Sequence, residues 1–103
     1  MKETNTTMTY TENLIENLTK HSNKETGEIL TNSEGVDYQF TTYTLKYKKA
    51  SRWLVNLFNQ AAKENNANHA NKFATDTHSF YFDRNPYKGQ PDGKITMKEL
   101  RVY

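Results

Sequence analysis

The residues with the clearest chemical potential are four cations within seven positions, Lys46, Lys48, Lys49 and Arg52, with Tyr47 between them. Three of these cations lie at or just before the expected start of a helix. The first turn of a helix carries partial positive charge and normally prefers Asp or Glu, so cations there break a local rule. Free backbone amides at the helix start would add donors for a phosphate or a similar anion. The sequence therefore predicts an anion-binding site at this basic cluster.

Aromatic side chains flank the basic cluster. Tyr43 and Tyr47 can offer flat faces for stacking against bases, as in proteins that bind single strands. A predicted C-terminal hairpin brings further cations to the same surface. The predicted nucleic-acid or anion site consists of Lys46, Tyr47, Lys48, Lys49, Arg52, Arg84, Lys88, Lys94, Lys98 and Arg101. The alternative is that the lysines only protect an exposed strand edge against aggregation, and the pattern does not decide between the two.

Charge is distributed unevenly along the chain, although the net charge is only +2. Residues 1–37 carry three basic and seven acidic side chains, whereas residues 38–103 carry eleven basic and five acidic ones. The two halves can attract each other in the fold, or the second half can present a basic surface to an anionic partner. The isoelectric point of about 8.8 lies below the value of about 9 that nucleic-acid-binding domains often exceed. The charge therefore does not decide whether the partner is a nucleic acid or another protein.

These features lead us to expect a non-enzymatic protein that binds single-stranded DNA or RNA with little sequence specificity. The first alternative is an inhibitor or adaptor that binds a host protein, such as a nuclease or a defence complex. The second alternative is a small ribonuclease that uses scattered Arg, Lys, His and Tyr residues and leaves no motif. The Asn- and Thr-rich, cysteine-free composition is typical of accessory proteins of phages and mobile elements, which predicts a place in the cytoplasm of a bacterial host.

Motifs for other chemistry are missing from the sequence. The absence of cysteine excludes disulfides and thiol catalysis. No two of the three histidines, His21, His69 and His78, lie at the helical or strand spacing of a metal-ligand pair. Residues 92–100 resemble the second half of an EF-hand loop, but Lys88 would occupy its first ligand position, and lysine cannot bind calcium. We therefore predict no metal and no cofactor. We also predict no membrane span, because no segment approaches about 20 apolar residues.

The elements that would position the basic cluster are a strand before it and a helix after it. Apolar residues recur at helical spacing from residue 50 to residue 61 and predict a long amphipathic helix. Its apolar stripe consists of Ala50, Trp53, Leu54, Leu57, Phe58 and Ala61. Large residues on such a stripe are usually buried, so we predict that Trp53 and Phe58 belong to the core.

The strand, predicted over residues 36–47, carries apolar residues on both of its faces. Val36, Tyr38 and Phe40 share one face, and Tyr43, Leu45 and Tyr47 share the other. A β-bulge or bend at Thr41–Thr42 would place all six on one side, and we favour it because the change is abrupt. The last predicted strand changes face in the same way, from Ile95 and Met97 to Leu100 and Val102.

Shorter elements complete the predicted fold. A capping box at Thr9 and Glu12 predicts a helix over about residues 10–20. A polar link over residues 21–26, a strand over 28–31 and a turn over 32–35 follow. We predict a kink near residues 65–66, a second short helix that ends at Phe73, and strands over 77–83 and 94–103. The result is a loose N-terminus at residues 1–8 and a single α+β domain at residues 9–103, with an antiparallel sheet of about four strands and one long amphipathic helix packed on it.

Overall fold

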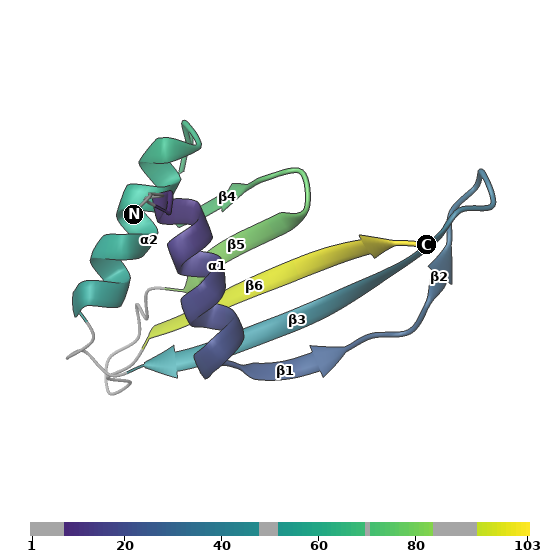
Figure 1. Cartoon of the computed structure of the whole chain (residues 1–103), viewed down its shortest axis with the longest axis horizontal. Helices are drawn as coiled ribbons and strands as arrows, with labels where there is room; N and C mark the ends of the chain where they lie inside the picture. Colours follow the sequence, from purple (N-terminus) through teal and green to yellow (C-terminus); the bar gives the residue numbers. More distant parts are fainter. Residues whose placement is uncertain (1–7, 48–51, 70, 84–92) are drawn as a thin grey trace, which may run out of the picture.

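The computed structural model describes residues 8–47, 52–69, 71–83 and 93–103. In chain order its elements are α1 (Tyr10–His21), β1 (Asn23–Thr26), β2 (Leu30–Thr31), β3 (Asp37–Tyr47), α2 (Arg52–Glu64), β4 (Lys72–Ala74), β5 (His78–Asp83) and β6 (Gly93–Val102). The strands form one antiparallel sheet in the order β1-β3-β6-β5-β4, and β2 also pairs with β3 (Figure 1). The α+β class is confirmed, but the described sheet has six strands rather than four, and it carries two helices of similar length.

Helix α1 begins where the capping box predicts. The Thr9 hydroxyl accepts a hydrogen bond from the Glu12 amide at 3.0 Å, and the Glu12 carboxylate accepts one from the Thr9 amide at 2.9 Å. The two preceding amides of the helix, those of Tyr10 and Thr11, donate to the Glu64 carboxylate at the end of α2, at 3.1 and 2.9 Å. The first three amide donors of α1 are therefore satisfied, two of them by the other helix.

Helix α2 buries Phe58 as predicted but leaves Trp53 exposed. The buried residues of α2 are Leu54, Leu57, Phe58, Ala61 and Ala62, and Val55 packs against them. The centre of this buried arc is rotated toward Ala62 relative to the predicted stripe, which leaves Trp53 roughly 110° from it. Trp53 is 55% exposed, so the prediction that it belongs to the core is wrong.

The predicted second short helix after α2 is absent from the described residues, and the prediction is wrong. Asn66 adopts a left-handed conformation with φ of 54° just after α2. Its amide donates to Lys63 O and the Ala67 amide donates to Ala62 O, each at 3.0 Å. This pair of bonds is the Schellman motif that ends many helices, and Asn tolerates the left-handed position better than most residues. Lys72–Ala74 instead forms strand β4. Of its three residues, only Phe73 is buried in the core.

Strands β3 and β6 pair without a bulge, so the prediction of a bulge at Thr41–Thr42 is wrong. Their register runs without a break from Tyr38–Val102 to Tyr47–Gly93. The two changes of apolar face lie opposite each other in this register, because Tyr43 pairs with Met97 and Phe40 pairs with Leu100. Both strands thus turn their apolar residues to the helices at one end of the sheet and to the opposite face at the other end.

More residues pair with the outer edge of β3, the edge away from β6, than the sequence predicts. Residues 23–26, predicted as a polar link, form β1 and pair with Thr41–Thr44 of β3. All four residues of β1 are exposed, so no alternation of apolar residues marks this strand. The strand predicted over residues 28–31 is present only as β2 at Leu30–Thr31, which forms a hairpin with β3 in which Leu30 pairs with Tyr38. Gly35 has a φ of 80° in its turn, a conformation that glycine adopts without strain.

The core lies between the two helices and one face of the sheet, which we call the covered face. In β3 and β6 the odd-numbered residues point to this face, and the even-numbered residues point to the opposite side, which we call the open face. Figure 1 shows that α1 crosses β3 and β6 at one end of the sheet and that the other end extends beyond both helices. The buried core residues are Leu14, Leu18, Tyr43, Leu54, Leu57, Phe58, Ala61, Ala62, Phe73, Phe80, Phe82, Ile95 and Met97.

The contact between Glu64 and the start of α1 predicts a pH-dependent stability. Hydrogen bonds from Thr11 and Tyr10 lower the pKa of the Glu64 carboxyl. Its contribution to the free energy of unfolding is therefore present above about pH 4.5, the ordinary pKa of a glutamate. The contribution is lost as the pH falls through the lower pKa of the folded protein. Glu64→Gln should reduce stability by less than about 1 kcal/mol at pH 7, because the carboxylate is exposed and solvent screens its charge.

Thermal unfolding across an acid series checks this prediction. The melting temperatures of the wild type and of Glu64→Gln should differ at pH 7 and converge toward pH 3. Glu16→Gln is a suitable control, because it removes an exposed carboxylate from the same helix α1 without touching this contact. A gap between wild type and Glu64→Gln that stays constant down to pH 3 would contradict the assigned role of the carboxylate.

Candidate nucleic-acid interface

The structure brings together three of the ten residues predicted for the anion site. Lys46 of β3 and Lys94 and Lys98 of β6 are even-numbered, exposed and located on the open face. Arg101 lies on the opposite side, where its guanidinium stacks over the Tyr103 ring at 5.1 Å from the ring centroid. Arg52 is exposed on the first turn of α2. Lys48, Lys49, Arg84 and Lys88 lie outside the described residues, and so does the side chain of Tyr47.

Lys46 and Lys94 are direct partners in the register of β3 and β6. Directly opposed residues in an antiparallel pair have their Cβ atoms roughly 5 Å apart, and like charges in this position destabilise the sheet. Asp83 of β5 pairs with Lys94 from its other side and offsets part of this repulsion. Two lysines in directly opposed positions concentrate positive charge on this part of the face, which favours an anion.

Lys72 and Tyr81 extend this surface toward the β4 edge, and neither of them is among the residues predicted from the sequence. They are partners in register between β4 and β5, and Tyr81 is 43% exposed. The signal for Tyr81 was present, because it alternates with Phe80 and Phe82, which are both buried. Lys72 lies next to the buried Phe73 in a strand of only three residues, which gives no period to recognise.

The open face is therefore basic at the end that the helices cover from behind. Among the paired residues of the described strands, four lysines there, Lys46, Lys72, Lys94 and Lys98, outnumber two carboxylates on the same face, Glu25 and Asp83. The remaining side chains of the described rows are small or hydroxylated: Asn23, Thr42, Thr44, Ala74, Ser79 and Thr96. Flat rows of hydroxyls between lysines offer hydrogen-bond donors without blocking the approach of an extended chain.

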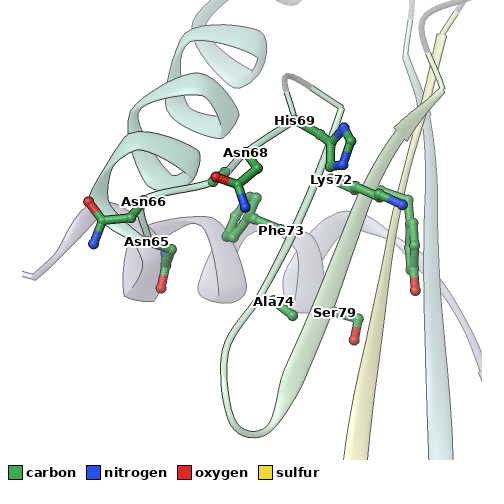
Figure 2. A pocket seen from close by; sticks show the side chains of 10 residues that line it. Asn65, Asn66, Asn68, His69, Lys72, Phe73, Ala74 and Ser79 are labelled. Atoms are coloured by element: carbon green, nitrogen blue, oxygen red, sulfur yellow. The ribbon is translucent and has the colours of Figure 1, made fainter.

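A pocket of about 310 Å³ adjoins Lys72 and Tyr81. Figure 2 shows it between the loop that follows α2 and the β4–β5 hairpin, with Asn68 and His69 on the loop side and Phe73 at its inner wall. The volume lies near the lower limit for small-molecule sites, which combine apolar walls with a few polar groups. Asn, His and Lys side chains around an apolar wall are suited to a single planar ring that carries hydrogen-bonding groups.

The start of α2 differs from the predicted anion site. The helix begins at Arg52 and has no acidic residue in its first turn, as the sequence analysis expects. The lysines that would complete the site there, however, are outside the described residues. Arg52 and the exposed Trp53 are adjacent on this turn and give α2 a cation and an aromatic face of its own.

A second polar cluster, which the sequence analysis missed, lies on the covered face. His78 Nε2 is 3.6 Å from a carboxylate oxygen of Glu99, and its Nδ1 is 2.8 Å from the Thr77 hydroxyl. The Tyr43 hydroxyl donates to the other Glu99 oxygen at 3.3 Å. Burial lowers the pKa of His78, although Glu99 acts in the opposite direction. Burial also raises the pKa of Tyr43, and the Glu99 charge adds to this effect, so Tyr43 remains a hydrogen-bond donor at neutral pH.

This cluster bears on the ribonuclease alternative. A carboxylate and an imidazole are the acid and base that such an enzyme would require, and β5 and β6 place His78 opposite Glu99. The pair nevertheless points to the side of the sheet away from Lys46, Lys94 and Lys98. Lys24 and Arg101 share its side, where they lie over the Tyr43 and Tyr103 rings. The structure thus separates the candidate acid–base pair from the lysines of the open face.

Further findings concern metal sites, membrane-spanning helices and similar proteins. Within residues 8–47, 52–69, 71–83 and 93–103, no group of three His, Asp or Glu residues is placed to hold a metal ion. Glu99, the ligand that the EF-hand pattern would supply, lies within the strand β6. Neither of the two described helices has the length and apolar content needed to cross a membrane. Comparisons with protein-family models, with curated proteins and with solved structures found no match to this chain.

Proposed function

We propose that the protein binds single-stranded nucleic acid on the open face of its sheet, without catalysing a reaction. The observation that carries this proposal is the grouping of Lys46, Lys72, Lys94 and Lys98 with the exposed Tyr81 on the face that neither described helix covers. The lysines extend roughly 13 Å along β6 and roughly 15 Å across the sheet, from β3 to β4. This is room for a few nucleotides in an extended conformation.

The proposed binding mode divides the nucleic acid between two kinds of contact. Phosphates lie along the lysines, which supply affinity but no sequence information. One base stacks on Tyr81, and the adjoining pocket receives its edge. A flat sheet face with exposed aromatic rings is suited to unstacked bases, whereas it has no element that enters the groove of a duplex. We therefore propose a preference for single strands with little dependence on sequence.

The proposed setting is that of an accessory protein of a phage or mobile element in the bacterial cytoplasm. Composition is its only support. The alternative function, inhibition of a host protein, would use the same lysines against an acidic protein surface. Loss of nucleic-acid binding in the following test would favour that alternative.

Fluorescence anisotropy with labelled oligo-dT and oligo-U at a series of salt concentrations tests the proposal. Four phosphate contacts should give a slope of log K against log[salt] of about −3, or roughly a 60-fold loss of affinity between 50 and 200 mM salt. A duplex of the same length should bind more weakly. Absence of binding at low salt, or a slope near zero, would rule out the proposed function.

A further inference from the structure

The pocket and strand β6 lie on opposite sides of Tyr81. The described residues that line the pocket come from the loop after α2 and from the β4–β5 hairpin, and none of them belongs to β6. In the sheet, β5 has β4 as one neighbour and β6 as the other. Tyr81 accordingly pairs with Lys72 on the pocket side and with Thr96 on the other side. A ring stacked on Tyr81 therefore has the pocket beside one edge and Thr96 beside the opposite edge.

This arrangement determines how a nucleotide lies on the open face. A nucleobase is joined to its sugar at one edge and carries most of its hydrogen-bonding groups at the other. The proposed function places the hydrogen-bonding edge in the pocket, which Asn68 and His69 line from the loop side. The sugar then points away from the pocket, toward β6, and lies over Thr96.

Two lysines of β6 flank this position. Lys94 and Lys98 are two residues before and two residues after Thr96, so all three share the open face. The Cα atoms of the two lysines lie roughly 13 Å apart, with Thr96 midway between them. A lysine side chain is long and flexible enough for each ammonium to lean toward Thr96. A sugar over Thr96 therefore has one lysine for the phosphate on each of its two sides.

The Thr96 hydroxyl faces the sugar in this arrangement. Thr96 is partly exposed, and its hydroxyl has no hydrogen-bond partner among the described residues of the protein. A threonine hydroxyl both donates and accepts hydrogen bonds, and so does the 2′-hydroxyl of RNA. A deoxyribose has only hydrogen at this position, so DNA would displace water from the Thr96 hydroxyl without replacing its hydrogen bonds.

We propose that the preferred ligand of the open face is single-stranded RNA, and that Thr96 binds the 2′-hydroxyl of the nucleotide whose base stacks on Tyr81. The inference rests on the proposed function, because it requires a nucleic acid on this face. It adds a choice between RNA and DNA that the lysines and Tyr81 do not make, since phosphates and stacking bases are common to both.

Anisotropy titrations of the wild type with oligo-U and oligo-dU of equal length test the proposal, because the two ligands differ covalently only at the 2′-hydroxyl. Oligo-U should bind about threefold to tenfold more tightly at the same salt concentration, as expected for the net effect of one hydrogen bond. The slope of log K against log[salt] should be the same for both, since the phosphate contacts are unchanged. An oligonucleotide of 2′-fluorouridine should bind as oligo-dU does, because fluorine favours the sugar shape of RNA but cannot donate a hydrogen bond.

Variants of the protein test the assigned contact. Thr96→Val removes the hydroxyl but keeps the shape and the strand propensity of the side chain, so it should reduce the preference for oligo-U to less than about twofold. Thr96→Ser keeps a hydroxyl and should retain most of the preference. The matched control is Thr41→Val, which makes the same change in β3 on the covered face and should leave the preference as in the wild type. Circular dichroism should show the same fold for all three variants.

The possible failures are distinguishable. Absence of binding to every oligonucleotide would rule out the proposed function and this inference together. Binding of oligo-dU at least as tight as that of oligo-U would overturn the inference and leave the proposed function intact. A preference for oligo-U that persists in Thr96→Val would also overturn it, because another group would then bind the 2′-hydroxyl.

Discussion

Phe58→Ala is expected to lower the free energy of unfolding by about 3–5 kcal/mol. Phe58 is fully buried and meets Phe73 and Phe82 edge to face, with ring centroids 5.2 and 5.3 Å apart. It therefore joins α2 to both strands of the β4–β5 hairpin, and its removal leaves a cavity between a helix and a sheet that cannot collapse onto each other. A domain of this size has a typical stability of about 5–15 kcal/mol, so much of the total would be lost. Denaturation with urea measures the change.

Trp53→Ala is the matched comparison for this substitution. It removes a larger aromatic side chain from the same helix, but from an exposed position, and the loss should stay below about 1 kcal/mol. The helical spacing of the sequence places both residues in the core and predicts similar losses. Equal destabilisation by the two variants would contradict the structure at α2, whereas a large difference would support the rotated position of its buried arc.

Lys46→Glu combined with Lys72→Glu is expected to weaken the binding of single-stranded oligonucleotides by about 100-fold at moderate salt. The double variant removes two of the four proposed phosphate contacts and adds two charges that repel phosphates. The slope of log K against log[salt] should become shallower by at least about 1.4, since each lost contact contributes about 0.7. The substitution at Lys46 places a carboxylate opposite Lys94, so the like-charge pair of the wild type becomes an attractive one and the fold should be preserved.

The control for this variant carries the same change of net charge on the helices. Lys20→Glu with Lys63→Glu alters the last turns of α1 and α2, at a cost of a few tenths of a kcal/mol each from the helix dipoles, and leaves the open face unchanged. Its affinity should stay within a few-fold of the wild type. If both double variants lose affinity equally, binding follows net charge alone and the open face is not the interface.

Local chemistry explains why part of the fold was predictable. The capping box at Thr9 and Glu12 involves residues three apart, so the sequence displays it directly, and α1 begins where it indicates. The alternation around Phe80 and Phe82 likewise predicts β5. The two changes of apolar face were visible in the sequence, but their meaning depends on which residues of β3 and β6 are partners. That register joins segments about sixty residues apart, and no local pattern contains it.

The parts that were not predicted depend on tertiary contacts. Strand β1 has no buried residue, and its conformation comes from hydrogen bonding to β3 rather than from its own composition. The exposure of Trp53 depends on where α1 and the sheet contact α2. For the candidate site, only the pairing of strands placed Lys46 beside Lys94, and Lys72 and Tyr81 on the same face. The sequence shows that these residues are lysines and a tyrosine, but it does not show that they lie close together in the fold.

The position of β6 has a consequence for synthesis and folding. It is the last described strand along the chain but lies in the middle of the sheet, and β3 and β5 are connected only through it. During translation, β3 can pair with β1 and β2 early, but its other edge stays open until residues 93–102 have been made. Contacts between segments so distant in sequence form slowly, and open strand edges promote aggregation. The nascent chain therefore passes through a stage in which one edge of β3 is paired and the other edge is unpaired and open to aggregation.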